Sequence, residues 1–193
     1  MKILENKVVC ILIMCVLIIA GLFLGGYKSL NGLYNDAAEI FFVGEYNDGI
    51  CVANDMAERS AAATNMITIS SDYPGFNESV DAQAMILRLS KANTDLTASI
   101  SVQSKENIAN AISANKKLDA AMTEVYHALG KQQLSASDEK YRQKLYADFN
   151  SRNDTISHDP YNSYAQKYNS VLADFPANII ASVMPVKSLP VAY

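Results

Sequence analysis

Histidine, cysteine and glycine-rich motifs, which build metal sites, disulfides and phosphate-binding loops, are scarce in this chain. Its two histidines, His127 and His158, lie far apart without His-Glu-x-x-His spacing or a cysteine pair, so no zinc ligand set is present. Serine is abundant, but no glycine pattern of a nucleophile elbow or a phosphate loop accompanies it. We therefore predict no catalytic, cofactor-binding or metal-binding residues, no cofactor and no enzymatic activity.

After the first 28 residues, basic side chains are fewer than acidic ones. Residues 1–28 contain three lysines and one glutamate, so they carry +2 of a total net charge of −4, and residues 29–193 carry −6. An acidic domain without a basic stripe argues against a nucleic-acid partner. Cys51 is the only cysteine outside the apolar N-terminal run, so no disulfide can form within residues 29–193.

Charged and strongly polar side chains are absent from the 17 residues Val8–Leu24. A membrane-spanning helix needs roughly 17 to 25 such residues, and Gly25, Gly26 and Tyr27 can extend this one. We interpret the run as an uncleaved single-pass anchor. The alternative is a cleaved signal peptide, but the run exceeds a usual h-region and no small-x-small pair closes it.

Proline is absent before Pro74, which allows one long first helix from the membrane to about Ser71. Gly44 and Gly49 each weaken a helix by about 1 kcal/mol, so a bend or break is expected between them. Tyr73-Pro74-Gly75 predicts a turn. Beyond the expected break, small and apolar residues suggest one buried stripe: Ile50, Ala53, Ala57, Ser60, Thr64 and Ile67.

Three further helices are expected. The second covers about residues 77–98. The third has the clearest apolar face, formed by Ile108, Ala111, Ile112, Asn115, Leu118, Met122, Val125, Tyr126 and Leu129. Asn115 lies within this face and is predicted to be a buried, register-setting polar group, and Gly130 is predicted to end the helix in a left-handed conformation. Ser135 fits the N-cap of a fourth helix, which Pro160 should kink or restart.

The last stretch, Tyr161–Ala181, carries an aromatic stripe at helical spacing: Tyr161, Tyr164, Tyr168, Val171, Leu172 and Phe175. Pro176 predicts the end of this helix at Phe175. At this spacing the tyrosine rings are expected in the core, with a ligand-binding lining as the alternative. Asn162 and Asn169, which follow two of the tyrosines, either bond across helices or face solvent.

Two Tyr-Asn pairs seven residues apart, followed by Phe-Pro-x-Asn and an alanine, resemble the C-terminal signature of the LemA family. The residues concerned are Tyr161, Asn162, Tyr168, Asn169, Phe175, Pro176, Asn178 and Ala181, with Lys187 and Tyr193 in the tail. A weaker likeness upstream involves Tyr34-Asn35, Arg59, Asn65-Met66 and Leu118 to Leu129. The sequence departs from the family between Phe41 and Thr64 and at Pro160.

This resemblance implies a membrane-anchored, antiparallel helical bundle of bacterial origin, whose molecular function is unsettled at family level and which has no catalytic residues. It also implies that the short N-terminus lies outside the cell. Lys2 and Lys7 before the span, against Lys28 after it, favour the opposite orientation by the positive-inside rule. The side of the membrane on which the bundle lies therefore stays open.

We predict an all-α protein, an antiparallel four-helix (up-down-up-down) bundle whose N-terminal transmembrane helix continues into the first bundle helix. Residues 1–28 form the anchor, and residues 29–193 form the bundle with a C-terminal apolar tail. The expected function is that of a cell-membrane-anchored interaction or scaffold protein with a protein partner; the alternative is a sensory or small-ligand-binding bundle. The tail is expected at the membrane-proximal end, with Lys187 and Tyr193 near the headgroups, or else as a cap on the bundle.

Overall fold

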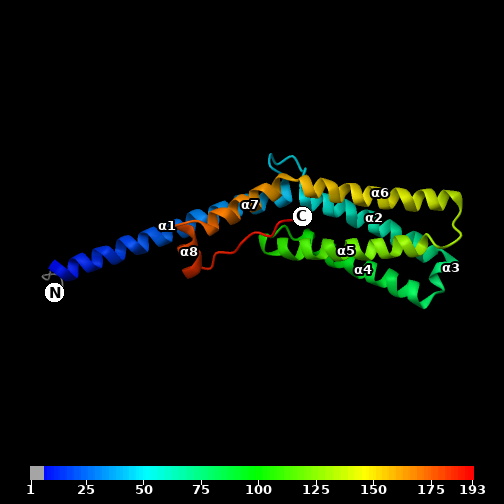
Figure 1. Cartoon of the computed structure of the whole chain (residues 1–193), viewed down its shortest axis with the longest axis horizontal. Coiled ribbons are helices and arrows are strands. Elements are labelled where there is room, and N and C mark those ends of the chain that lie inside the picture. Colours follow the sequence, from blue (N-terminus) through cyan, green and yellow to red (C-terminus); the bar gives the residue numbers. More distant parts are fainter. Residues whose placement is uncertain (1–6) are drawn as a thin grey trace.

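The computed structural model describes residues 7–193 and is an elongated, all-helical protein (Figure 1). The helices are α1 (Lys7–Val43), α2 (Val52–Asp72), α3 (Pro74–Asn77), α4 (Val80–Ser101), the 3-10 turn η1 (Lys105–Asn107), α5 (Ile108–Leu129), α6 (Ala136–His158), α7 (Pro160–Ala173) and α8 (Ala177–Val183). Neighbouring helices pack antiparallel, and the apolar N-terminal helix continues into the body. The predicted fold class is confirmed.

Two regions make up the body. The head consists of α2, α4, α5 and α6, with α2 packed against the other three. The stem consists of the C-terminal half of α1 together with α7 and α8. Two of the four expected helices are interrupted where head and stem meet, so that α1 and α2 form one broken rod and α6 and α7 form another that runs back beside it (Figure 1).

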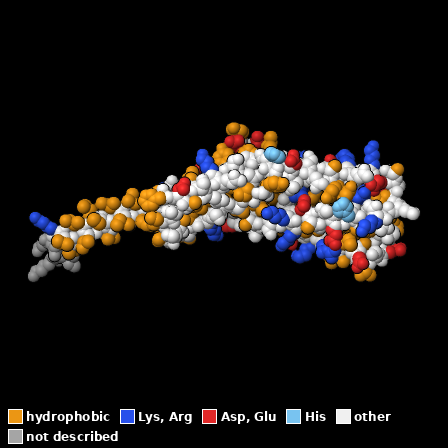
Figure 2. Space-filling view, viewed as in Figure 1, with side chains coloured by type: hydrophobic (Ala, Val, Ile, Leu, Met, Phe, Trp, Pro, Cys, Tyr) orange, Lys and Arg blue, Asp and Glu red, His pale blue; other side chains and the backbone are white. Residues whose placement is uncertain are grey.

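The N-terminal half of α1 projects from the body. Among the described residues, α1 is the one helix long and apolar enough to cross a membrane, and none of its most apolar 18-residue window is buried. Figure 2 shows hydrophobic side chains along this thin end, whereas charged side chains gather on the broad end. The C-terminal half of the same helix is buried in the body at Leu30, Ala37, Ala38, Phe41 and Phe42.

The break between α1 and α2 falls between Gly44 and Gly49, as predicted. Both glycines have positive φ, 84° and 78°, a conformation that other residues rarely adopt. Because the helical phase restarts after this loop, the predicted stripe on α2 is largely wrong. The buried residues of α2 are Val52, Ala53, Asp55, Met56, Arg59, Ala62, Ala63, Met66 and Ser70, whereas Ile50, Ala57 and Thr64 are exposed.

The second predicted helix lies three residues later than expected, as α4, because Pro74–Asn77 forms its own short helix and the Ser79 hydroxyl caps α4 by accepting from the Ala82 amide. The predicted face of α5 is confirmed, since Asn115 is buried with its apolar neighbours. Gly130 does end α5, but its φ is −68°, so the predicted left-handed conformation is wrong. A Cβ at Gly130 would lie 2.8 Å from Nη1 of Arg142, so a larger residue there would displace that guanidinium group.

The break between α6 and α7 occurs at Pro160, which restarts the helix at its first turn as predicted. The carboxylate of Asp159 caps α7 by accepting from the Tyr161 amide at 2.8 Å. Tyr161 and Tyr168 are buried. Tyr164 and Phe175 are exposed, so the stripe prediction is wrong for both. For Phe175 the reason is that α7 ends at Ala173, two residues before it.

The tail, residues 184–193, takes a path that the sequence did not reveal. Helix α8 packs against α1 beside Gly26 and Leu30, at the end of the apolar run. The chain then reverses and runs back along α7 towards the head (Figure 1, red). Tyr193 reaches a hollow lined by Arg59, so its predicted place near the headgroups is wrong.

Candidate functional site

Aromatic rings spaced seven residues apart on two helices join α7 to α1. Tyr168 meets Tyr34 with ring centroids 5.6 Å apart, and Tyr161 meets Phe41 at 5.0 Å, both edge to face. A seven-residue step is nearly two turns, so each pair repeats the other along the antiparallel helices. The rings therefore form the core of the stem, as the sequence predicts.

The hydroxyl groups of these two tyrosines reach beyond the core to the backbone of the tail. Tyr168 donates to the carbonyl oxygen of Lys187 at 3.0 Å, and Tyr161 donates to that of Pro190 at 2.6 Å. Burial, and secondarily the neighbouring Tyr34, raises the pKa of Tyr168 to about 12 and raises the pKa of Tyr161 as well. Both phenols are thus neutral hydrogen-bond donors at physiological pH.

The two asparagines beside the tyrosines also bind the tail. Asn169 donates through Nδ2 to the carbonyl oxygen of Leu189 at 2.7 Å and accepts from the amide of the same residue at 2.9 Å. Asn162 accepts from the amide of Ala192 at 2.9 Å. These contacts replace the inter-strand bonds that an extended segment would make in a sheet.

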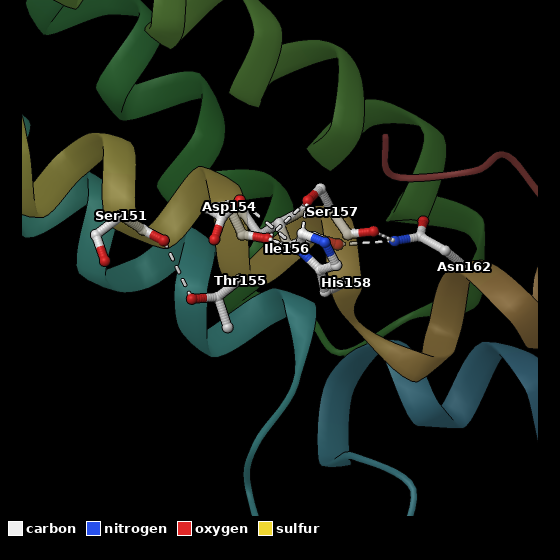
Figure 3. Close-up of polar contacts among 7 residues, drawn as sticks. All are labelled: Ser151, Asp154, Thr155, Ile156, Ser157, His158 and Asn162. Carbon is white, nitrogen blue, oxygen red and sulfur yellow. Dashed lines mark hydrogen bonds and ion pairs between the residues drawn. The ribbon is translucent and has the colours of Figure 1, made fainter.

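Asn162 also connects the tail to the break between α6 and α7. Its Nδ2 donates to the carbonyl oxygen of Ile156 at 2.7 Å, near the end of α6, where helix carbonyls lack intrahelical partners (Figure 3). His158 lies at the same helix end, exposed, with Nδ1 2.9 Å from the Asp154 carbonyl oxygen and from the Ser157 hydroxyl (Figure 3). The Asn162 amide group therefore bonds α6 on one side and the tail on the other.

The repeat of the Tyr-Asn pairs along α7 has the same length as three extended residues of the tail. Seven helical residues advance about 10.5 Å, and three extended residues advance about 10 Å. Tyr168 and Tyr161 contact Lys187 and Pro190, three residues apart, and Asn169 and Asn162 contact Leu189 and Ala192, also three apart. The two Tyr-Asn pairs are hence a ladder, the Tyr-Asn ladder, that fits an antiparallel extended peptide.

Only two side chains of the tail are buried. Leu189 is 1% exposed and Ala192 is 5% exposed, and both belong to the main core. One buried leucine contributes about 1.5–3 kcal/mol, and each of the five hydrogen bonds contributes about 0.5–1.5 kcal/mol. Ordering six residues costs about 1–2 kcal/mol each. These opposing contributions are of similar size.

The end of the tail lies beside a buried arginine in the head. Arg59 on α2 is 0% exposed and donates through Nη1 to Asn115 at 2.6 Å and to Asn153 at 3.2 Å, and through Nη2 to Asp119. Its guanidinium carbon lies 3.9 Å from the centroid of the Phe149 ring. Burial lowers the pKa of Arg59, and the charge of Asp119 opposes that shift. This cluster, the Arg59 cluster, joins α2, α5 and α6.

One hollow lies at the end of the tail, and another lies between α1 and η1. The first, of about 300 Å³, is lined by Arg59, Asn115, Lys116, Asp119, Asn153, Ala192 and Tyr193. The second, of about 450 Å³, is lined by Asn35, Ala38, Glu39, Phe42, Val43 and residues 103–106. Within residues 7–193, no group of three or more histidine, cysteine, aspartate or glutamate side chains comes together as in a metal site.

The sequence identified the ladder residues but not what they bind. Asn115 was predicted to be a buried polar group, and the prediction is confirmed, with Arg59 as its donor. For Asn162 and Asn169 both a cross-helix role and a solvated one were open; Asn162 does bond to α6, and both bind the tail. The available signal was the three-residue step from Leu189 to Ala192, which matches the seven-residue step of the ladder.

Comparisons of the chain with protein-family models, with curated proteins and with solved structures find no match. What is established is an all-helical protein with a long apolar N-terminal helix that continues into the body.

Proposed function

We propose that the protein is a single-pass membrane protein of the LemA type, which holds a helical head at the membrane surface and acts by binding a protein partner rather than by catalysis. The observation that carries this proposal is α1. The side chains of its apolar half are not buried in the body of the protein, whereas residues of its other half are part of the core. A helix that is both span and core joins the stem directly to the bilayer.

Membrane anchoring is tested by alkaline carbonate extraction of cells that express the full chain. The wild-type protein and an Ile18→Arg variant are compared, with Val80→Arg, an exposed site on α4, as the matched control. The wild type and the control should remain in the pellet, and Ile18→Arg should be partly released, because a central arginine costs about 2.5 kcal/mol or more on insertion. Release of the wild type, or a mature N-terminus near Gly26, would instead show a cleaved signal sequence.

The partner is tested by cross-linking in native membranes, purification and mass spectrometry of both proteins and small molecules. A stoichiometric protein recovered with the wild type supports the scaffold function. A second candidate function, sensing a small ligand, is favoured by the 450 Å³ hollow between α1 and η1, which Lys105 and Glu106 line. A small molecule that copurifies without a protein would favour this second function.

A further inference from the structure

We propose that the Tyr-Asn ladder of α7 is a peptide-binding site, and that the tail is its exchangeable resident ligand. The ligand class is an extended peptide with a leucine-sized residue followed, three positions later, by a small one. This inference rests on the proposed function, whose partner it describes: a protein that presents such a segment can displace the tail.

The contacts are those of peptide recognition. All five hydrogen bonds from the ladder go to backbone atoms of the tail, so they are available to any extended segment whatever its side chains. Asn169 both donates to and accepts from Leu189, which fixes the register of the segment. Backbone bonds that supply affinity, with pockets for alternate side chains that supply specificity, characterise recognition of extended peptides.

Selectivity comes from the two buried positions. Leu189 and Ala192 both enter the main core, and Ala192 also lines the hollow beside Arg59. Pro190 is compatible because the ladder uses only its carbonyl oxygen. Prolines at 185 and 190 also restrict the free segment to extended conformations, which lowers the entropy lost when it binds.

The tail is suited to leave the site. It has no helix or strand of its own, and the side chain of Tyr193 is exposed. Lys187 and Ser188 also face solvent. Tethering keeps the tail at an effective concentration of about a millimolar, so a free peptide binds only when the tail is weakened or when the partner presents its segment at high local concentration.

The test uses the full chain in detergent micelles and a fluorescein-labelled peptide with the sequence of residues 185–193. Leu189→Asp is the variant that unseats the tail and leaves the ladder intact, and Ser188→Asp, at an exposed position, is its control. We expect fluorescence anisotropy to show saturable binding to Leu189→Asp that is at least tenfold stronger than to the wild type or to Ser188→Asp. Adding Asn169→Ala to Leu189→Asp should remove that gain, whereas adding Asn178→Ala, at an exposed asparagine of α8, should not.

Three results would overturn the proposal. The first is no binding by Leu189→Asp while its circular dichroism and melting remain helical and cooperative. The second is equal binding by all variants, which would place the peptide elsewhere. The third is global unfolding of Leu189→Asp, which would make the tail an inseparable part of the core. If carbonate releases the protein but Leu189→Asp still binds the peptide, only the proposed membrane anchoring is contradicted. If the protein stays in the membrane but Leu189→Asp does not bind the peptide, only the peptide-binding site is contradicted.

Discussion

In the head, α2 packs against three other helices, and a buried arginine binds side chains from two of them. In the stem, α1 and α7 form a pair of helices whose remaining open side is covered by α8 and by ten residues without regular structure. A bundle of four helices supplies its own core, whereas a pair of helices exposes one side of its interface. The stem therefore depends on a loose segment in a way that the head does not.

The largest effect is expected from disrupting the Arg59 cluster. Arg59→Ala should lower the free energy of unfolding by about 3–5 kcal/mol, because it removes a buried cation and leaves its partners without a donor. Urea denaturation followed by circular dichroism measures this. Arg88→Ala breaks a solvent-exposed ion pair with Glu124 and should cost less than about 1 kcal/mol. Equal effects of the two substitutions would contradict the importance of the cluster for the head.

Removing a ring from the stem should cost somewhat less. Tyr168→Ala is expected to lower stability by about 3 kcal/mol, at the lower end for a large aromatic, because only two helices and the tail surround it. Tyr193→Ala, at an exposed terminus, should cost much less. If native-state hydrogen exchange shows that Tyr168→Ala weakens α4 and α5 as much as α7, head and stem unfold as one unit and do not differ in their dependence on the tail.

Alkaline pH should lower the stability of the stem before that of the head. Since the folded pKa of Tyr168 is about 12, above its ordinary value of 10.0, its contribution to stability is fully present below pH 10 and is lost as the pH rises towards 12. Phenylalanine does not titrate, so the stability advantage of the wild type over Tyr168→Phe should shrink in this window. Denaturation midpoints of both proteins at several pH values decide this, and a constant difference would show that the hydroxyl does not titrate with unfolding.

The smallest effect on stability is expected at α8, where the predicted membrane contact is still to be tested. Val183 of α8 is 68% exposed, and the buried residues Ala177 and Ile180 of the same helix pack on α1 at Leu30, near the end of its apolar part. The chain has no tryptophan, so Val183→Trp supplies a unique tryptophan whose emission is distinguishable from that of the tyrosines. In lipid nanodiscs its emission should lie to the blue of that of a control, Val102→Trp, in the exposed connection between α4 and η1, and should resist aqueous quenchers. Identical spectra would show that α8 does not touch lipid.

Local signals were enough to predict most of the helices. Proline at 160, glycines at 44 and 49 and the periodic face from Ile108 to Leu129 each act within a few residues, and the structure has the corresponding break, loop and helix. Which face of α2 is buried could not be predicted by continuing the pattern of α1, because the loop between the two helices interrupts the helical periodicity. The tail was missed because its partners lie about 20 to 30 residues away on a helix, and no periodicity within an extended segment encodes such a pairing.

Because α1 is continuous from the apolar run to Val43, its length fixes the distance between the bilayer and the head. With Val8–Leu24 in a bilayer, the residues from Leu24 to Gly44 rise about 30 Å at 1.5 Å per residue. Helix α8, the tail and the head then lie at increasing distances from the lipid, and α1 sets the spacing between them. A segment that competes for the ladder must be delivered at the middle level, roughly 15 to 25 Å from the surface, where Tyr34 and Phe41 meet α7.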